Sequence, residues 1–117
     1  MERDPKTQAA AAHLGQDSRI TFVQDDADRW VARNRAGSLF DLAYVDCRPG
    51  KILRLADLLA LLEPGGLYIV DDLLPQDTWP ADHPERVNDF LAHLPDIPNL
   101  LATQLRWASG LIVGARL

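Results

Sequence analysis

The sequence predicts an α/β fold, in which a doubly wound, mostly parallel sheet ends with an antiparallel C-terminal hairpin. Two apolar runs, residues 40–46 (FDLAYVD) and 67–72 (LYIVDD), each end on aspartate, and a leucine-rich helical pattern separates them. Buried parallel strands read as nearly continuous apolar runs, and the ligand crevice of such a sheet opens at their carboxyl ends. We therefore expect Asp46, Asp71 and Asp72 to converge on one edge of one sheet, where a small-molecule site would lie.

The composition is that of a single globular domain. Of the 117 residues, 47% are hydrophobic and 25% are charged. The net charge of -5 argues against a broad surface for nucleic acid or anionic membranes. The single cysteine, Cys47, fits a reducing compartment, and no apolar run reaches the ~20 residues of a membrane span. The charged N-terminus lacks the apolar region of a signal peptide, so we expect a cytoplasmic protein.

Helical and strand patterns alternate through the first half of the chain. A first helix is expected to start near Pro5 and to end at Gly15. Residues 20–23 (ITFV) predict a short strand, and Asp25 or Asp26 is expected to cap a second helix.

The middle of the chain carries the main strand signals. Residues 39–45 predict a second strand, and residues 51–62 (KILRLADLLALL) predict a helix whose leucines face the core. Residues 64–66 (PGG) predict a turn, and residues 67–70 predict a third strand.

The last third of the chain predicts a helix and a hairpin. Residues 73–82 read as a loop, and residues 84–94 read as an amphipathic helix. Two strands follow, at residues 100–107 and 111–116, and Ser109-Gly110 supplies a turn signal between them. The alternation of helix and strand indicates a parallel sheet with an antiparallel edge.

Taken in order, these motifs resemble the class I S-adenosylmethionine (SAM)-dependent methyltransferases. The small bacterial O-methyltransferases related to catechol and caffeoyl-CoA O-methyltransferases are the most similar group. Residues 2–5 (ERDP) resemble the acidic end of the family's second strand, and residues 24–27 (QDDA) resemble its Gly-Asp-Ala turn. Residues 40–46 and 64–72 resemble its fourth strand, the following turn and its fifth strand. The resemblance implies that residues 1–117 are a partial, Rossmann-like methyltransferase domain, truncated at its N-terminus.

The resemblance also implies which residues bind the cofactor. Glu2 would hold the ribose hydroxyls of SAM, and Asp26 with Ala27 would lie beside the adenine. Asp46 would border the cofactor and act as a catalytic residue. From the residues alone, the alternative for Glu2 is a frayed terminal charge, and the alternative for Asp26 is a plain helix N-cap.

Three interpretations are open for the strand-end aspartates. In cation-dependent members of the family, an Asp after the fourth strand and an Asp-Asn pair after the fifth bind a divalent cation such as Mg²⁺. Asp46, Asp71 and Asp72 would be its ligands here, with Asp72 in the place of the Asn. The Lys that the family often carries three residues after the first Asp is replaced by Pro49, and Lys51 is displaced. The other interpretations are metal-free active-site carboxylates and structural caps.

Two further side chains lie in the loop that overhangs the substrate in the family. There, Trp79 would wall a pocket and His83 would act in acid–base chemistry. The alternative for Trp79 is an anchor that packs the loop.

The family's first strand and its Gly-rich loop are absent from the sequence, and its second strand is represented only by its last residue. In the family's strand order, 3-2-1-4-5-7-6, their absence would leave residues 20–23 and 39–45 roughly 14 Å apart, at ~4.8 Å per strand step. Three explanations are open: the natural protein is longer, the sheet closes up, or a partner chain fills the slot.

The function implied by the resemblance is SAM-dependent methyl transfer to the oxygen of a small-molecule acceptor. The reaction would be an in-line displacement at a sulfonium methyl group. We expect a homo-oligomer, such as a dimer, with no nucleic-acid or membrane partner. The alternative is a non-catalytic, truncated methyltransferase-like module that oligomerises or binds a partner.

Overall fold

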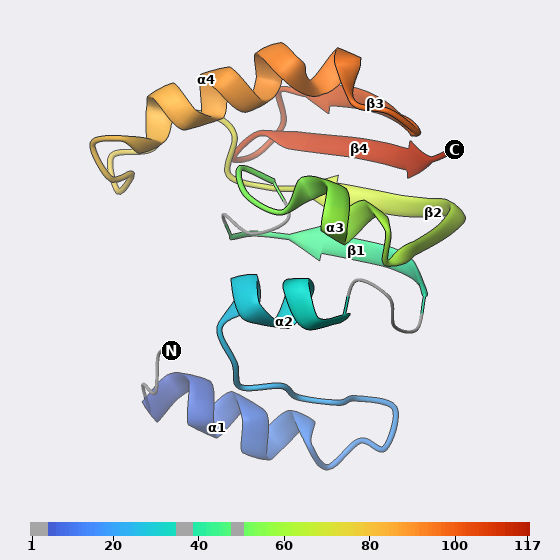
Figure 1. Ribbon diagram of the computed structural model, residues 1–117. Helices are drawn as coiled ribbons and strands as arrows, with labels where there is room; N and C mark the ends of the chain where they lie inside the picture. Colours follow the sequence, from blue (N-terminus) through green and yellow to red (C-terminus); the bar gives the residue numbers. More distant parts are fainter. Residues whose placement is uncertain (1–4, 35–38, 48–50) are drawn as a thin grey trace.

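The computed structural model describes residues 5–34, 39–47 and 51–117, which form a four-stranded sheet with helices (Figure 1). In chain order the elements are α1 (Pro5–Leu14), α2 (Ala27–Asn34), β1 (Phe40–Val45), α3 (Leu55–Leu59), β2 (Leu62–Val70), α4 (His83–His93), the 3₁₀ helix η1 (Leu94–Asp96), β3 (Leu100–Leu105) and β4 (Leu111–Arg116). The predicted α/β alternation is confirmed. No helix in these ranges has the length and apolar character needed to cross a membrane.

The strands lie in the order β1-β2-β4-β3. β1 and β2 pair in parallel, with Val45 opposite Val70. β4 runs antiparallel to both β2 and β3, so the predicted C-terminal hairpin is confirmed. Parallel pairing is confined to β1 and β2 in the described sheet, because the segment at residues 20–23 does not join it.

The strand predicted at residues 20–23 is therefore wrong for this structure. The ladders between described residues join β1 to β2, β2 to β4 and β3 to β4, and none includes this segment. Ile20, Phe22 and Val23 are 40%, 40% and 52% exposed. A strand needs a ladder partner for its backbone groups, and none of the described strands lies beside this segment. The sheet has not closed up around it.

The helix predicted at residues 51–62 is also wrong at both ends. α3 is preceded by Arg54, whose backbone is left-handed with φ of 60°, so the helix cannot extend back through it. At the other end, the Leu61 amide bonds to the Leu58 carbonyl at 2.9 Å, and the Leu61 carbonyl accepts the Phe40 amide at 2.7 Å. These bonds turn the chain into β2, which begins at Leu62 and includes the predicted turn at residues 64–66.

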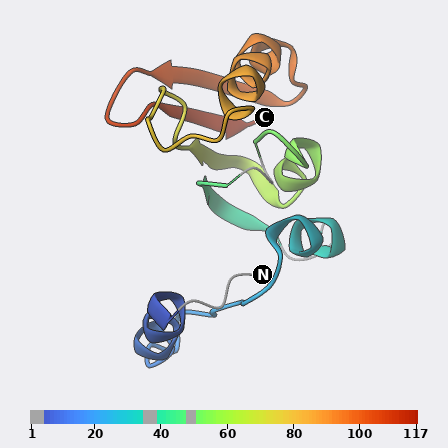
Figure 2. The ribbon, with the colours of Figure 1, turned by 90° about the vertical axis from the view of Figure 1, so that its left-hand side faces the viewer.

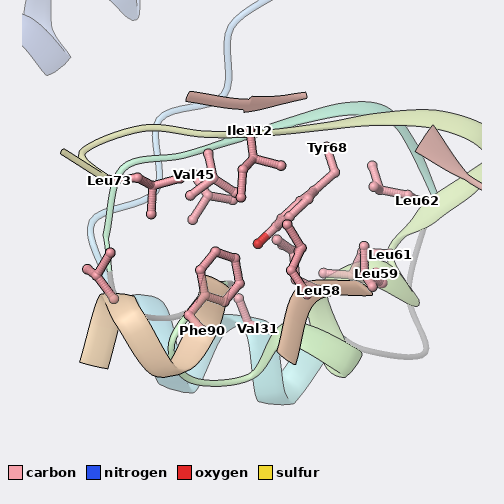
Figure 3. Packing of buried hydrophobic residues seen from close by; sticks show 13 residues of the cluster. Val31, Val45, Leu58, Leu59, Leu61, Leu62, Tyr68, Leu73, Phe90 and Ile112 are labelled. Atoms are coloured by element: carbon pink, nitrogen blue, oxygen red, sulfur yellow. The ribbon is translucent and has the colours of Figure 1, made fainter. Parts of the chain in front are cut away.

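The hydrophobic core lies between one face of the sheet and helices α2, α3 and α4. Figure 3 shows Val31, Leu58 and Phe90 of these helices facing Val45 and Ile112 of the strands. The other buried apolar residues of this core are Leu59, Leu61, Leu62, Tyr68, Val70, Leu73, Val87 and Leu94. The leucine stripe between residues 58 and 62 therefore packs in the core, as predicted, although only part of it is helical.

Candidate active site

The carboxyl ends of β1 and β2 meet at one edge of the sheet. The parallel register pairs Val45 with Val70, and it continues one step further because the Asp71 amide donates to the Val45 carbonyl at 3.0 Å. Asp46 is exposed directly after β1, and Asp71 and Asp72 directly follow β2. The aspartates that the sequence assigns to a common edge therefore lie at adjacent strand ends.

The Asp71 carboxylate joins three separate parts of the chain. It accepts a hydrogen bond of 2.6 Å from the Tyr44 hydroxyl of β1 and another from the Ser109 hydroxyl in the turn before β4. Its Oδ1 atom also accepts the Asp72 amide at 2.7 Å. The Ser109 and Tyr44 hydrogen bonds lower the pKa of Asp71. The bond to Asp71 raises the pKa of Tyr44 to about 12, because ionisation would place two anions together.

Lys51 brings a buried cation to the same edge. Its side chain is 3% exposed, and its Nζ donates to the Asp71 carbonyl at 2.9 Å. The sequence predicts that this lysine is displaced from the family's position, and the structure shows that it nevertheless reaches the strand end. Its charge contributes to the lowered pKa of Asp71, after the two hydroxyl bonds.

Asp72 fastens the loop at residues 73–82. Its backbone is left-handed, with φ of 67°, and its carboxylate accepts the Trp79 indole N–H at 2.8 Å. The other carboxylate oxygen lies 3.8 Å from Nε2 of the buried His83. The Trp79 and His83 rings meet edge to face, with centroids 4.5 Å apart. Trp79 therefore packs the loop onto Asp72, in agreement with the anchoring interpretation.

The hydrogen bonds of Asp71 and Asp72 bear on the metal site that the resemblance implies. The described part of the chain contains no group of three or more His, Cys, Asp or Glu side chains that could hold a metal ion. Hydroxyl groups of Tyr44 and Ser109 occupy the oxygens of Asp71, and Trp79 occupies an oxygen of Asp72. Because these donors turn Asp71 and Asp72 toward different partners, the residues do not fit a shared divalent cation.

Asp26 caps α2, as its position in the sequence predicts. Its Oδ1 atom accepts the Arg29 amide at 3.2 Å, and its carbonyl accepts the Trp30 amide at 2.9 Å. Asp25 supports this turn, since it accepts the Asp26 amide at 2.7 Å and pairs with Arg33.

The predicted adenine-binding turn borders a shallow hollow of about 200 Å³. Its lining residues are Val23, Asp25, Ala27 and Trp30. An indole wall beside a carboxylate suits a flat heterocycle with an amino group. Glu2, the predicted ribose ligand, lies outside the described residues.

Tyr44 and Ser109 are site residues that the sequence interpretation missed. Tyr44 lies within an apolar run that indicates only a buried strand, and Ser109 lies in a turn pattern that indicates only a hairpin. Their meeting at Asp71 depends on strand order, since residues 44, 71 and 109 come from three separate segments. Local sequence patterns contain no signal for such a contact.

Comparisons with known proteins identify the fold. No protein-family model matches the sequence, and no curated protein shows significant similarity to it. The structure is similar over 98% of the chain to a candidate O-methyltransferase from Klebsiella pneumoniae, with a TM-score of 0.77 and 23% identity. It is similar over 99% to the O-methyltransferase from Bacillus cereus in complex with SAH, with a TM-score of 0.78 and 17% identity. It is similar over 99% to the SAH-bound Podospora anserina methyltransferase PaMTH1, with a TM-score of 0.74 and 20% identity.

These matches cover 59%, 60% and 58% of the three proteins, so the chain spans about three fifths of their length. The described strand order, β1-β2-β4-β3, agrees with the 4-5-7-6 part of the order that the sequence resemblance implies. The chain therefore has a Rossmann-like α/β fold that is similar to part of these O-methyltransferase structures.

Proposed function

We propose that the chain takes part in SAM-dependent methyl transfer to the oxygen of a small-molecule acceptor. The observation that carries this proposal is the similarity, over 99% of the chain, to an O-methyltransferase in complex with SAH, the product that SAM leaves after methyl transfer. The carboxyl edge of β1 and β2 supports it, because ligands of open α/β sheets bind at that edge. Fold similarity alone assigns no chemistry, so the residues at the edge have to supply it.

In this proposal, the cofactor lies along the edge between α2 and β1. Ala27, the first residue of α2, lines the hollow walled by Trp30, and Asp26, directly before it, lies beside the adenine. Glu2 binds the ribose hydroxyls, and Asp46 borders the reactive end. The bound cofactor supplies a methyl group on a sulfonium centre, which is already activated for transfer.

The chain's own residues then position the acceptor and receive a proton. With the cofactor bound as methyl donor, the exposed carboxylate of Asp46 would accept the proton that the acceptor hydroxyl loses on methylation. Asp71 and Lys51 hold the neighbouring strand end in place. We propose that Asp46, Asp71 and Asp72 act without a shared divalent cation, because the last two are already bonded to other side chains.

Calorimetric titration of the purified chain with SAM tests the proposal. We expect heat of binding that is lost in Asp46→Asn and in Trp30→Ala. Asp77→Asn is the matched control, because Asp77 is an exposed loop carboxylate. Absence of heat at millimolar SAM would contradict cofactor binding by this chain alone. Binding that appears only with added Mg²⁺ and disappears with EDTA would contradict the cation-free site.

The remaining expectations concern the cellular location, the oligomeric state and the partners of the protein. We propose a cytoplasmic protein without a nucleic-acid partner, on the basis of the net charge of -5 and the single cysteine. The homo-oligomer also stays a proposal. Light scattering after size-exclusion chromatography measures the oligomeric state, and a filter-binding assay with RNA and DNA measures nucleic-acid affinity.

A further inference from the structure

A hollow of about 450 Å³ opens beside α3, at the end of the sheet where β2 begins and β4 ends. Its volume lies within the range of about 300–1,000 Å³ that is typical of small-molecule sites. We refer to it as the amino-edge hollow. Its lining includes Leu55, Leu59, Ala60, Ile97, Asn99 and Arg116. Asp71 directly follows the opposite end of β2, so this hollow is separate from the candidate active site.

The shortness of α3 opens the amino-edge hollow. Residues 51–62 would supply about three turns if they were fully helical, but only Leu55–Leu59 form a helix. Within the described chain, α3 packs closely against α2 and β2, and no comparable packing joins it to α4. Figure 2 shows α3 and α4 on the same side of the sheet, with the C-terminus between them. The space between the two helices is therefore left open above the core.

The floor of the hollow is apolar and continuous with the core. Leu59 belongs to the core and is 7% exposed, and Leu55 and Ile97 pack against the core. Leu55 and Ile97 also line a neighbouring hollow of about 410 Å³, which reaches Phe90 of α4. The apolar surface therefore continues beyond the amino-edge hollow, and this shape suits a ligand with an elongated apolar body.

Arg116 gives the hollow a positive charge. The side chain is half-buried, and its Nη1 atom donates to the Leu62 carbonyl at the start of β2. A guanidinium group has five N–H donors, so the others can bind a carboxylate. Among the described residues, no carboxylate lies at ion-pair distance from Arg116, and none lines the hollow. The lining is therefore positive in a chain whose net charge is -5.

Asn99 adds a second donor group beside Arg116. β3 begins at the next residue, Leu100, which pairs with Arg116 across the hairpin. The backbone of Asn99 is left-handed, with φ of 61°, and its carbonyl accepts the Leu117 amide at 2.9 Å. These contacts fix Asn99 next to the end of β4. Because an amide and a guanidinium both supply N–H donors, together they suit the two oxygens of a carboxylate.

We propose that the amino-edge hollow binds a small molecule with one carboxylate and an elongated apolar body, the chemistry of a medium-chain fatty acid. The carboxylate accepts hydrogen bonds from Arg116 and Asn99. The apolar body lies over Leu55, Leu59 and Ile97. The site is at the other end of β2 from the proposed methyl transfer, so the failure of either proposal leaves the other standing.

The charge of the lining also favours this ligand over a second copy of the chain. In a two-fold dimer centred on the hollow, the same surface of each copy faces the other. The two Arg116 side chains would then approach each other, and the described lining contains no carboxylate to separate them. An anionic small molecule instead neutralises the charge.

The first test is an amide NMR titration of the chain with octanoate at millimolar concentration. We expect saturable shifts at Leu55, Ala60 and Asn99, and at least tenfold weaker binding of octan-1-ol, which has the same chain length without the charge. Equal affinities for the two probes would overturn carboxylate recognition. Absence of saturable shifts, or shifts confined to the edge at Asp46 and Asp71, would overturn the site.

The second test reverses the charge complementarity with little change of shape. Asn99→Asp is tolerated by a left-handed backbone. We expect it to weaken octanoate binding at least tenfold and to leave octan-1-ol binding unchanged. Ala60→Glu, at an exposed lining position, should have the same effect. Asn88→Asp is the matched control, because Asn88 is exposed on α4 and lies outside the hollow.

Two outcomes of the second test would overturn the proposal. An equal loss of octanoate binding in Asn88→Asp and Asn99→Asp would assign the effect to net charge rather than to the hollow. Light scattering that shows a dimer, with resonances of Leu55 and Asn99 that change with protein concentration in the absence of octanoate, would identify a second copy as the occupant.

Discussion

The hydroxyl of Tyr44 donates a 2.6 Å hydrogen bond to the carboxylate of Asp71, across the carboxyl ends of two parallel strands. Ser109, in the turn before β4, donates a second hydrogen bond to the same carboxylate. Asp71 thereby ties β1, β2 and the C-terminal hairpin together at the edge where a ligand would bind. A carboxylate bonded in this way fixes the shape of the edge. The exposed Asp46 is therefore the candidate for the carboxylate that takes part in a reaction.

The first prediction concerns the ionisation of Tyr44. In Asp71→Asn, we expect the pKa of Tyr44 to fall from about 12 toward its ordinary value near 10, because the neighbouring negative charge is gone. Phenolate absorbance against pH measures this shift, and Tyr44→Phe identifies the signal against that of Tyr68, the other tyrosine. An unchanged midpoint would contradict the Tyr44–Asp71 bond.

The second prediction concerns stability in acid. The pKa of Asp71 is lower in the folded state than its ordinary value, so the stability that its carboxylate adds is present above that value and is lost as the pH falls through the folded-state pKa. Ser109→Ala, which removes a donor, should lower the free energy of unfolding by about 1 kcal/mol near neutral pH. Urea unfolding of both proteins should show this difference shrinking as the pH falls below the ordinary pKa of an aspartate. A difference that stays constant would assign the effect to packing.

The third prediction concerns the turn that carries Ser109. Gly110 has φ of +91°, and an added Cβ would lie 2.5 Å from the Leu74 amide nitrogen. Gly65 has φ of +85°, but an added Cβ there meets no atom within 4 Å. Gly65→Ala should therefore cost only the backbone strain, about 1–3 kcal/mol. Gly110→Ala should cost more, because the loop after β2 must also move. Thermal unfolding of the two variants compares them, and equal losses would contradict the close approach.

The parts of the fold that could be predicted from the sequence are those set by local pattern. The apolar run at residues 40–45 and the turn at Ser109-Gly110 correspond to β1 and to the β3–β4 hairpin. Local sequence patterns gave wrong predictions where pairing with a residue distant in the sequence determines the secondary structure. Residues 20–23 have the apolar character of a strand but no ladder partner among the described strands. Leu62 continues a helical pattern yet joins β2.

The features of the candidate site also divide into those that the sequence predicts and those that it does not. The convergence of Asp46 and Asp71 follows from a general property of parallel strands, so the sequence predicts it. The engagement of Asp71 by Tyr44 and Ser109 depends on which strands become neighbours, and that order is not encoded in any single motif. The metal site stays a prediction of the resemblance, because the sequence places the carboxylates but not the hydrogen-bond donors that Asp71 and Asp72 meet in the structure.

The fourth prediction tests the shortened helix. Leu62 is fully buried in β2, whereas Leu53, which the helical pattern also places on the apolar stripe, is 45% exposed. Leu62→Ala should lower the free energy of unfolding by about 2–5 kcal/mol, because it leaves a cavity in the core. Leu53→Ala should change it by less than about 0.5 kcal/mol. Chemical denaturation measures both, and similar losses would indicate that residues 51–62 form one helix with a common buried face.

The fifth prediction concerns the loop that Asp72 holds. Trp79→Phe keeps an aromatic ring beside His83 but removes the N–H group that donates to Asp72 at 2.8 Å. We expect a loss of about 1 kcal/mol in the free energy of unfolding and faster amide exchange across residues 73–82, because the left-handed backbone at Asp72 loses its anchor. Trp107→Phe is the control, since Trp107 is 67% exposed. If both variants left exchange in this loop unchanged, the indole bond would contribute nothing to its order, and the Asp72 carboxylate would be available for other contacts at the carboxyl ends of β1 and β2.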